Sequence, residues 1–257
     1  MKNLLCGLSL LLFSLSLGAQ NRLEGNYILT SFGASFDQFN DAYVSPVNYD
    51  GYSGLFGLGW HTYTGPWMNN LDVLGHAGWQ SPQLQANQGS RTLGLGFRGH
   101  YSLRYRFWKS NTHQIFAGVY SQNAFILREH SNYSNSAQSF SGFFGYGPSL
   151  AYTFSNSSKI FKKDWHWSWQ SEVNIPLGTY LLRPNFIRQY SAGEIGDRGH
   201  HFLNGTWQID FRHSLIWHLR TGNQIRLMYA WEYFQTDRFN ALYNGGHQVQ
   251  LQLFFKL

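Results

Sequence analysis

Residues 91–107, RTLGLGFRGHYSLRYRF, alternate between two kinds of side chain almost without a break. Odd positions carry mainly Leu, Phe and Tyr, and even positions carry Gly, Ser, His and Arg. A period of two is typical of a β-strand with one apolar and one polar face. The pattern recurs along the whole chain between polar or Gly-, Asn- and Pro-rich connections. About ten such segments are predicted, at 26–37, 52–63, 67–80, 92–107, 113–127, 142–155, 164–182, 203–220, 223–236 and 246–257.

The connections alternate in length. Those containing TYTGPW, KSNT and RTGN are tight, and most of the others are long and polar. Short turns at one end and long loops at the other are typical of an up-and-down barrel that crosses an outer membrane. The chain is therefore predicted to be an all-β, antiparallel, transmembrane up-and-down barrel of about ten strands. Eight or twelve strands stay open, because 164–182 can bend at Pro176 and 113–127 alternates poorly.

The volume of the aromatic side chains predicts which face points inward. Aromatic residues make up 18% of the chain, including 10 Trp, and most of them fall on the apolar face of the segments. The interior of a barrel of eight or ten strands is too narrow to hold so many rings. The apolar face is therefore expected to point outward, with Trp and Tyr near the segment ends forming an aromatic girdle.

The first residues predict export. MKNLLCGLSLLLFSLSLGAQ joins one lysine to an apolar run and then small residues, which is typical of a signal peptide spanning 1–19. Residues 20–257 are predicted to form a single domain, because no linker or composition break interrupts them. Cys6 is the only cysteine, so the mature domain is expected to contain neither a disulfide nor a reactive thiol.

The composition argues against nucleic acid as a partner. Charged residues make up only 12% of the chain, against about 25% in ordinary soluble domains. The net charge is +6, yet the basic residues are scattered singly along strand-like segments and form no continuous patch.

The last segment, HQVQLQLFFKL, carries Val249, Leu251, Leu253, Phe255 and Leu257 on one face. It resembles the C-terminal assembly signal of outer-membrane β-barrel proteins of Gram-negative bacteria, although it ends in Leu where that family more often has Phe or Trp. The resemblance implies residence in the bacterial outer membrane. It also implies contact with outer-membrane lipid and lipopolysaccharide, and assembly by the barrel assembly machinery.

An inward polar face would bring many charges together. Because unpaired buried charges are costly, the charged side chains are expected to pair across the lumen. The favoured hypothesis is a largely plugged lumen with a structural, interaction or assembly role. Basic groups outnumber carboxylates in the predicted set, so a narrow, porin-like channel for small anions is the alternative. The set comprises Asp72, His76, Arg98, His100, Arg104, Arg106, His166, Glu172, Asp210, Arg212, His218, Arg226 and Glu232.

A lipid-modifying hydrolase is a second alternative. Lipid A deacylase barrels use a His-x-Ser pair with a Glu, and WHWSWQSE places His166, Ser168 and Glu172 on one face of a strand. That face is the predicted lumen face, which argues against access to lipid A. Omptin proteases resemble this chain in strand count, but their acidic pairs find no match, and Asp210 and His213 fall on opposite faces. No catalytic, cofactor-binding or metal-binding residue is therefore predicted.

The long loop expected at 183–202 offers a third site. It combines basic and aromatic residues that suit contact with a protein partner, a glycan or lipopolysaccharide phosphate. The candidate contact residues are Arg183, Arg188, Tyr190 and Arg198.

Overall fold

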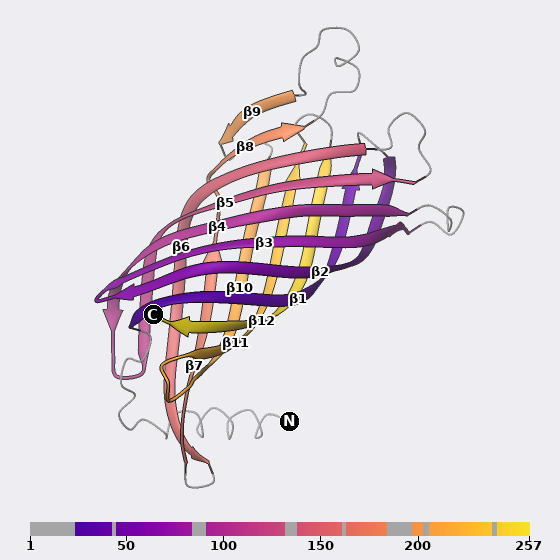
Figure 1. Ribbon diagram of the computed structural model, residues 1–257. Coiled ribbons are helices and arrows are strands. Elements are labelled where there is room, and N and C mark those ends of the chain that lie inside the picture. Colours follow the sequence, from indigo (N-terminus) through magenta and orange to yellow (C-terminus); the bar gives the residue numbers. More distant parts are fainter. Residues whose placement is uncertain are drawn as a thin grey trace, which may run out of the picture.

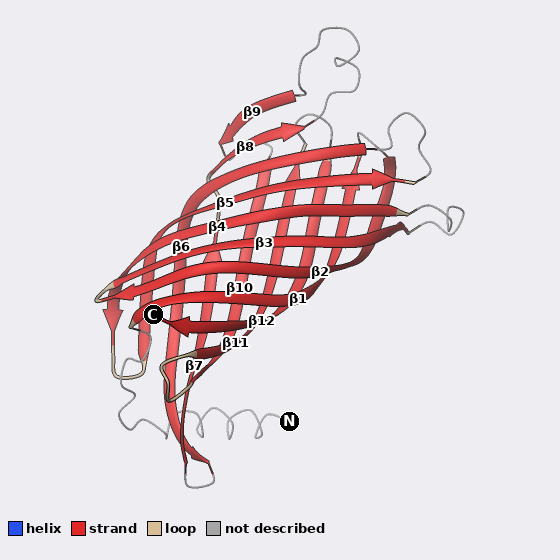
Figure 2. Cartoon of the chain, viewed as in Figure 1, coloured by secondary structure: helices blue, strands red, loops and turns tan. Residues whose placement is uncertain are grey.

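The computed structural model describes residues 24–42, 45–83, 91–131, 138–160, 163–183, 197–202, 206–237 and 241–257. The predicted signal peptide lies outside these residues. Within the described ranges, the regular secondary structure consists of β-strands alone (Figure 2). None of these residues forms a helix that is long and apolar enough to cross a membrane.

Twelve strands are present in the described chain (Figure 1). They are β1 (Gly25–Asp41), β2 (Ser45–Thr64), β3 (Trp67–Pro82), β4 (Thr92–Lys109), β5 (His113–His130), β6 (Gln138–Ile160), β7 (Lys163–Asn174), β8 (Gly178–Arg183), β9 (Asp197–Phe202), β10 (Thr206–His218), β11 (Gln224–Thr236) and β12 (Leu242–Lys256).

Ten of the strands close into a ring. Each strand from β1 to β7 pairs with its sequence neighbour, β7 pairs with β10, and β10, β11 and β12 follow in order. The ring closes because β12 pairs with β1 along fifteen residue pairs, from Tyr27 with Lys256 to Asp41 with Leu242. The prediction of an antiparallel barrel of about ten strands is confirmed. The two additional strands, β8 and β9, extend the wall beyond β7 and β10 (Figure 1).

The register defines the tilt of the strands. Following paired residues once around the ring from His113 leads back to β5 at Phe125, twelve residues further along the strand. A stagger of twelve over ten strands corresponds to a tilt of about 40° from the barrel axis, given the usual strand spacing and rise. A row of paired residues therefore climbs along the axis as it passes around the barrel.

Pro176 divides one long strand into β7 and β8. A proline has no N–H to donate, so the segment cannot pair continuously on both sides. Pairing with β6 continues through the break, because the amides of Ile175 and Leu177 donate to the carbonyls of Pro148 and Tyr146, at 3.2 and 3.0 Å. On the edge that faces away from β6, β7 pairs with β10 before the break and β8 pairs with β9 after it. The predicted bend at Pro176 is thus a break within the seventh wall segment.

The two ends of the barrel differ. We call the end with the β2–β3, β4–β5, β6–β7 and β10–β11 connections the turn end, and the opposite end the loop end. Gly65, at φ +57°, forms the β2–β3 turn. Strands run further toward the loop end than the alternation predicted: β1 continues to Asp41 and β6 begins at Gln138.

The apolar residues of the alternating pattern face outward. On β4, Phe97 and Phe107 are 52% and 57% exposed, whereas the intervening Ser102 and Arg104 are fully buried. The same holds around the ring, where exposed Leu, Phe, Tyr and Trp side chains cover the outer wall. The polar face therefore lines the interior, and the core of the protein is polar over much of its length.

Gly147 lets the broken strand pack closely on β6. A Cβ atom at this position would lie 2.2 Å from the carbonyl oxygen of Ile175. We expect Gly147→Ala to destabilise the barrel by about 1–3 kcal/mol, the usual cost of overpacking. The measurement is the urea midpoint of unfolding in detergent micelles. Gly54→Ala is the matched control, because its nearest atom would lie 4.0 Å away, and an equal loss in both variants would contradict the prediction.

Candidate functional site: the barrel interior

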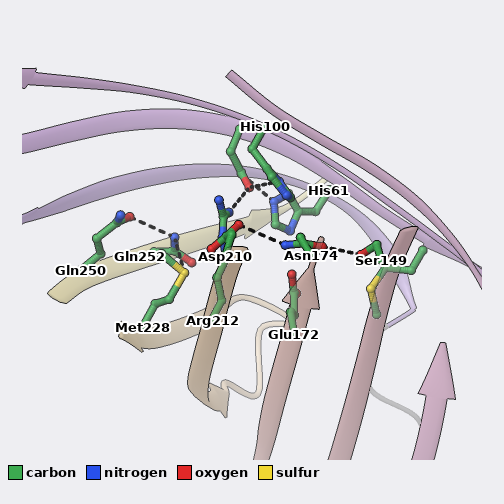
Figure 3. Close-up of polar contacts among 12 residues, drawn as sticks. His61, His100, Ser149, Glu172, Asn174, Asp210, Arg212, Met228, Gln250 and Gln252 are labelled. Carbon is green, nitrogen blue, oxygen red and sulfur yellow. Dashed lines mark hydrogen bonds and ion pairs between the residues drawn. The ribbon is translucent and has the colours of Figure 1, made fainter. Parts of the chain in front are cut away.

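A network of charged side chains occupies the centre of the interior (Figure 3). Arg212 on β10 lies in its middle. Its Nε donates to Asp210 Oδ2 at 2.9 Å, and its guanidinium nitrogens lie 4.0 Å from Asp72 and 3.8 Å from Glu232. Glu232 in turn contacts Arg98. Because Arg98 belongs to β4 and Glu232 to β11, this ion pair spans the lumen between separate walls.

Arg104 forms a second branch of the network. Its side chain is fully buried and donates to Glu172 Oε2 at 2.7 Å and to Ser149 Oγ at 2.6 Å. Asn174 joins the two branches, because its Oδ1 accepts from Ser149 at 2.5 Å and its Nδ2 donates to Asp210 at 3.0 Å (Figure 3). Strands β4, β6, β7 and β10 are therefore tied together inside the barrel.

Two histidines approach Asp72. The Nε2 of His61 lies 2.7 Å from Asp72 Oδ1, and the Nδ1 of His100 lies 3.9 Å from Oδ2. Glycine makes room for this contact, since a Cβ at Gly59 would lie 2.5 Å from the same Oδ1. On β12, Gln248, Gln250 and Gln252 form a ladder of side-chain amide hydrogen bonds beside the charged network.

A separate charged group lies near the loop end. Arg183 is buried and forms an ion pair with Asp41. Arg128 is also buried, with its guanidinium carbon 4.1 Å from the centre of the Phe39 ring. Asp37 accepts hydrogen bonds from Ser35 and Ser53, each at 2.8 Å.

Six arginines and six carboxylates lie in these two charged groups and beside them. The predicted lumen set contains more basic groups than carboxylates, and the difference is made up by Arg106, nearer the turn end, and by the histidines. The predicted set missed Asp41, Arg128 and Arg183, which lie where the strands continue into predicted loops, and Asp37, the last residue of a predicted segment. The set is Arg98, Arg104, Arg128, Arg183, Arg212 and Arg226 against Asp37, Asp41, Asp72, Glu172, Asp210 and Glu232.

The remaining predicted lumen residues lie at the margins of the network. Arg106 donates to Gln114 at 3.1 Å near the turn end. Arg226 lies with its guanidinium carbon 4.3 Å from the Phe254 ring centre and donates to the Tyr63 hydroxyl at 3.3 Å. His76 is half-buried and packs against Gly96, where a Cβ would lie 2.4 Å from its ring.

Two buried apolar layers flank the central charges. The turn-end layer draws side chains from β1, β2, β3, β5, β6, β10 and β12, and so reaches most of the wall. The loop-end layer is smaller and includes Phe143 and Phe234, whose ring centres are 4.2 Å apart. The turn-end layer comprises Tyr27, Leu29, Tyr63, Met68, Phe116, Ala151, Ile216 and Phe254, and the loop-end layer comprises Ala124, Ile126, Phe143, Leu181, Phe234 and Leu242.

Sequence reasoning did not foresee these layers, although a signal was present. At Phe254 and Ile216, apolar residues occupy inward positions next to the outward Phe255 and Trp217, so the alternation is interrupted. Such adjacent apolar pairs mark where an apolar side chain replaces a polar one inside the barrel.

The cavities among the network residues are small. Two have volumes of about 30 Å³ and one of about 10 Å³. A buried water needs roughly 10–15 Å³ of such space, so each cavity has room for one or a few waters.

The predicted hydrolase residues are not arranged as a triad. The Ser168 hydroxyl lies 2.8 Å from Nε2 of His218 and 2.9 Å from Ser155, so its histidine partner is on β10 instead of being His166. Glu172 is held by Arg104 and by Gln170, which donates to it at 2.7 Å. Ser168 is also buried inside the barrel.

The predicted loop contacts need correction where the structure describes them. Arg183 belongs to β8 and is paired with Asp41 inside the barrel, so it is not available to a partner. The backbone of Arg198 lies in β9, opposite Leu182. The predicted loop is shortened because β8 and β9 form a hairpin above the ring. Arg188 and Tyr190 lie outside the described residues.

Comparison with protein-family models and with curated proteins finds no match. Among solved structures, the transport unit of the autotransporter AIDA-I from Escherichia coli is similar with a TM-score of 0.48 and 11% identity, over 95% of this chain and 93% of that one. The outer membrane protease OmpT from Escherichia coli gives a TM-score of 0.46 and 8% identity, over 91% and 95%. The translocator domain of the autotransporter NalP from Neisseria meningitidis gives a TM-score of 0.41 and 8% identity, over 98% of this chain and 95% of that one.

The ion pair across the lumen yields a stability prediction. Glu232→Leu leaves Arg98 buried without its carboxylate and is expected to cost about 3–5 kcal/mol of unfolding free energy. The double variant Arg98→Leu/Glu232→Leu is expected to regain at least half of that loss, because no charge of the pair stays uncompensated. Urea unfolding in detergent micelles measures both.

Arg106→Gln is the control for this cycle, because Arg106 contacts the neutral Gln114. Its effect is expected to stay within about 1 kcal/mol. If the loss of unfolding free energy in the double variant equalled the sum of the losses in the two single variants, Arg98 and Glu232 would not stabilise each other.

Proposed function

We propose that this protein is an integral barrel of the bacterial outer membrane with a plugged lumen, and that its role is structural or in interaction with other membrane components. The outer wall supports the membrane location. Large apolar and aromatic side chains are exposed there, as in Val119 at 59% and Trp207 at 73%, while ionised groups are paired inside. In water such a surface would aggregate, whereas in lipid it is favourable.

The turn-end apolar layer is the main observation that supports a plugged lumen. Its rings and aliphatic side chains are almost completely buried and come from strands on all sides of the barrel. Ions and polar solutes would have to displace these side chains in order to pass. Arg98, Arg104 and Arg212 are each paired with a carboxylate, which weakens the argument for anion selectivity.

The same features support a non-catalytic role. Ser168 and Glu172, two of the three residues in the predicted hydrolase set, are buried inside the barrel, where Ser168 hydrogen-bonds to His218 and Glu172 accepts from Arg104. Interaction is then expected to take place on the outer wall or at the loop end.

The membrane location predicts a depth-dependent cost for an outward charge. Val119 is the seventh of the eighteen residues of β5 and is exposed on the outward face, and Glu129 is exposed on the same face next to the loop end of the strand. We expect Val119→Arg to destabilise the barrel in lipid vesicles by about 2–4 kcal/mol, and Glu129→Arg by about 0–1 kcal/mol. Equal effects in urea unfolding would contradict a bilayer centred on this part of the wall.

Conductance in planar bilayers tests the plug. The refolded wild-type barrel in potassium chloride is expected to be silent. The variant Phe116→Ala/Phe254→Ala removes two rings from the turn-end layer and is expected to leak ions. Phe255→Ala is the matched control, because Phe255 faces outward next to Phe254, and it is expected to stay silent.

Steady wild-type openings would instead favour the channel hypothesis. In that case Arg104→Ala would alter anion selectivity, and the plugged lumen would be abandoned.

A further inference from the structure

A row of hydrogen-bonded polar side chains crosses the outward face of the barrel. It consists of three histidine–hydroxyl pairs, and each uses the histidine Nδ1. We call it the polar row. The pairs are His113 with Tyr152 at 2.6 Å, Ser171 with His213 at 3.0 Å, and Tyr229 with His247 at 2.7 Å.

The strand register places the three pairs side by side in one line across the wall. Tyr152 is paired with Ser171, Ser171 with His213, and His213 with Tyr229. The row therefore passes over six adjacent strands of the ring, from β5 to β12. Within it, Tyr152 and Tyr229 are 36% and 40% exposed, so it forms part of the outer surface.

The middle of the row lies deep in the proposed membrane. His213 is five residues from His218, where β10 ends, which is roughly 13 Å along the axis at a tilt of about 40°. The apolar band of an outer-membrane barrel is about 25 Å tall, so His213 falls near its middle. Because a paired row climbs about 3 Å per strand, the polar row crosses the band obliquely.

The polar row is not fully satisfied within the chain. The indole Nε1 of Trp169 donates to Ser171 Oγ at 2.8 Å, and the Ser171 hydroxyl shares a second hydrogen bond with His213 Nδ1. In either tautomer the Nε2 atom of His213, as an N–H donor or as a bare acceptor, has no hydrogen-bond partner within the described residues. An acyl chain can neither donate nor accept a hydrogen bond here, and an unsatisfied polar group in hydrocarbon is costly.

A partner that satisfies Nε2 must therefore offer a hydrogen-bonding group at mid-membrane depth, which lipid headgroups cannot reach. A second copy of this chain, related by a two-fold axis along the membrane normal, offers hydroxyl groups at that depth by symmetry, and a hydroxyl can donate or accept. We propose that the face formed by β7, β10 and β11 is a homodimer interface, in which the Ser171–His213 pairs of two copies meet. The inference rests on the membrane location proposed above.

The oligomeric state in lipid tests this interface. Wild-type protein is expected to form dimers in nanodiscs or detergent, measured by sedimentation across a concentration series. His213→Leu is expected to raise the dimer dissociation constant at least tenfold while the barrel still folds, because leucine suits a lipid-facing position. Leu71→Ala is the control on β3, on the opposite side of the ring, and is expected to leave the dissociation constant unchanged.

Cross-linking locates the face. Leu227 and Leu71 are 45% and 47% exposed, and their Cys variants are compared with a short bismaleimide in vesicles. Leu227→Cys is expected to yield the covalent dimer and Leu71→Cys to yield none. The proposal would be overturned by a wild-type monomer at every concentration or by an unaltered dimer in His213→Leu. It would also be overturned if Leu227→Cys in native membranes were linked only to a different protein.

Insertion is scored separately from dimerisation. Heat-modifiable migration and resistance of the reconstituted barrel to protease report membrane insertion in the same samples. An inserted monomer overturns the homodimer alone, whereas a chain that does not insert overturns the membrane location and the dimer together.

Discussion

The pairing of β12 with β1 is the constraint on which the rest of the structure depends. These strands stand at opposite ends of the described chain, yet fifteen residue pairs join them. Closure removes the free edges that an open sheet of this length would expose. It also encloses the interior, so that side chains of distant strands meet there. Without it, Arg98 and Glu232 would lie on the two separated halves of a sheet.

The barrel reverses the usual placement of apolar side chains, but the reversal is incomplete. Phe97 and Val119 face outward, while Arg104 and Asp210 are fully buried. Apolar layers nevertheless return to the interior at both ends of the charge network. They shield the central ion pairs from water, and Coulombic attraction is stronger where water is excluded. The network and the layers thus stabilise each other, and the cavities among the network residues are small.

The ten wall segments were predictable because alternation of period two is a local property of each strand. The ends of the strands were not, since β1 and β8 continue into polar sequence where backbone pairing with neighbours outweighs composition. This is why Arg183 was assigned to a loop although it is buried against Asp41. The inward face could be derived from side-chain volume, but not the partners of each charge. Whether Ser168 meets His166 or His218 depends on register between strands that are distant in sequence.

The connectivity of the charge network has a consequence for the order of assembly. Arg98 and Arg104 lie on β4, whereas their carboxylate partners arrive with β11 and β7, 134 and 68 residues later. A half-formed wall would present these guanidinium groups to an open, hydrated cleft. They lose that hydration only as the later strands dock, when each carboxylate arrives with the backbone that carries it. Dehydration of the interior is therefore coupled to the docking of β7 and β11 and to closure of the ring.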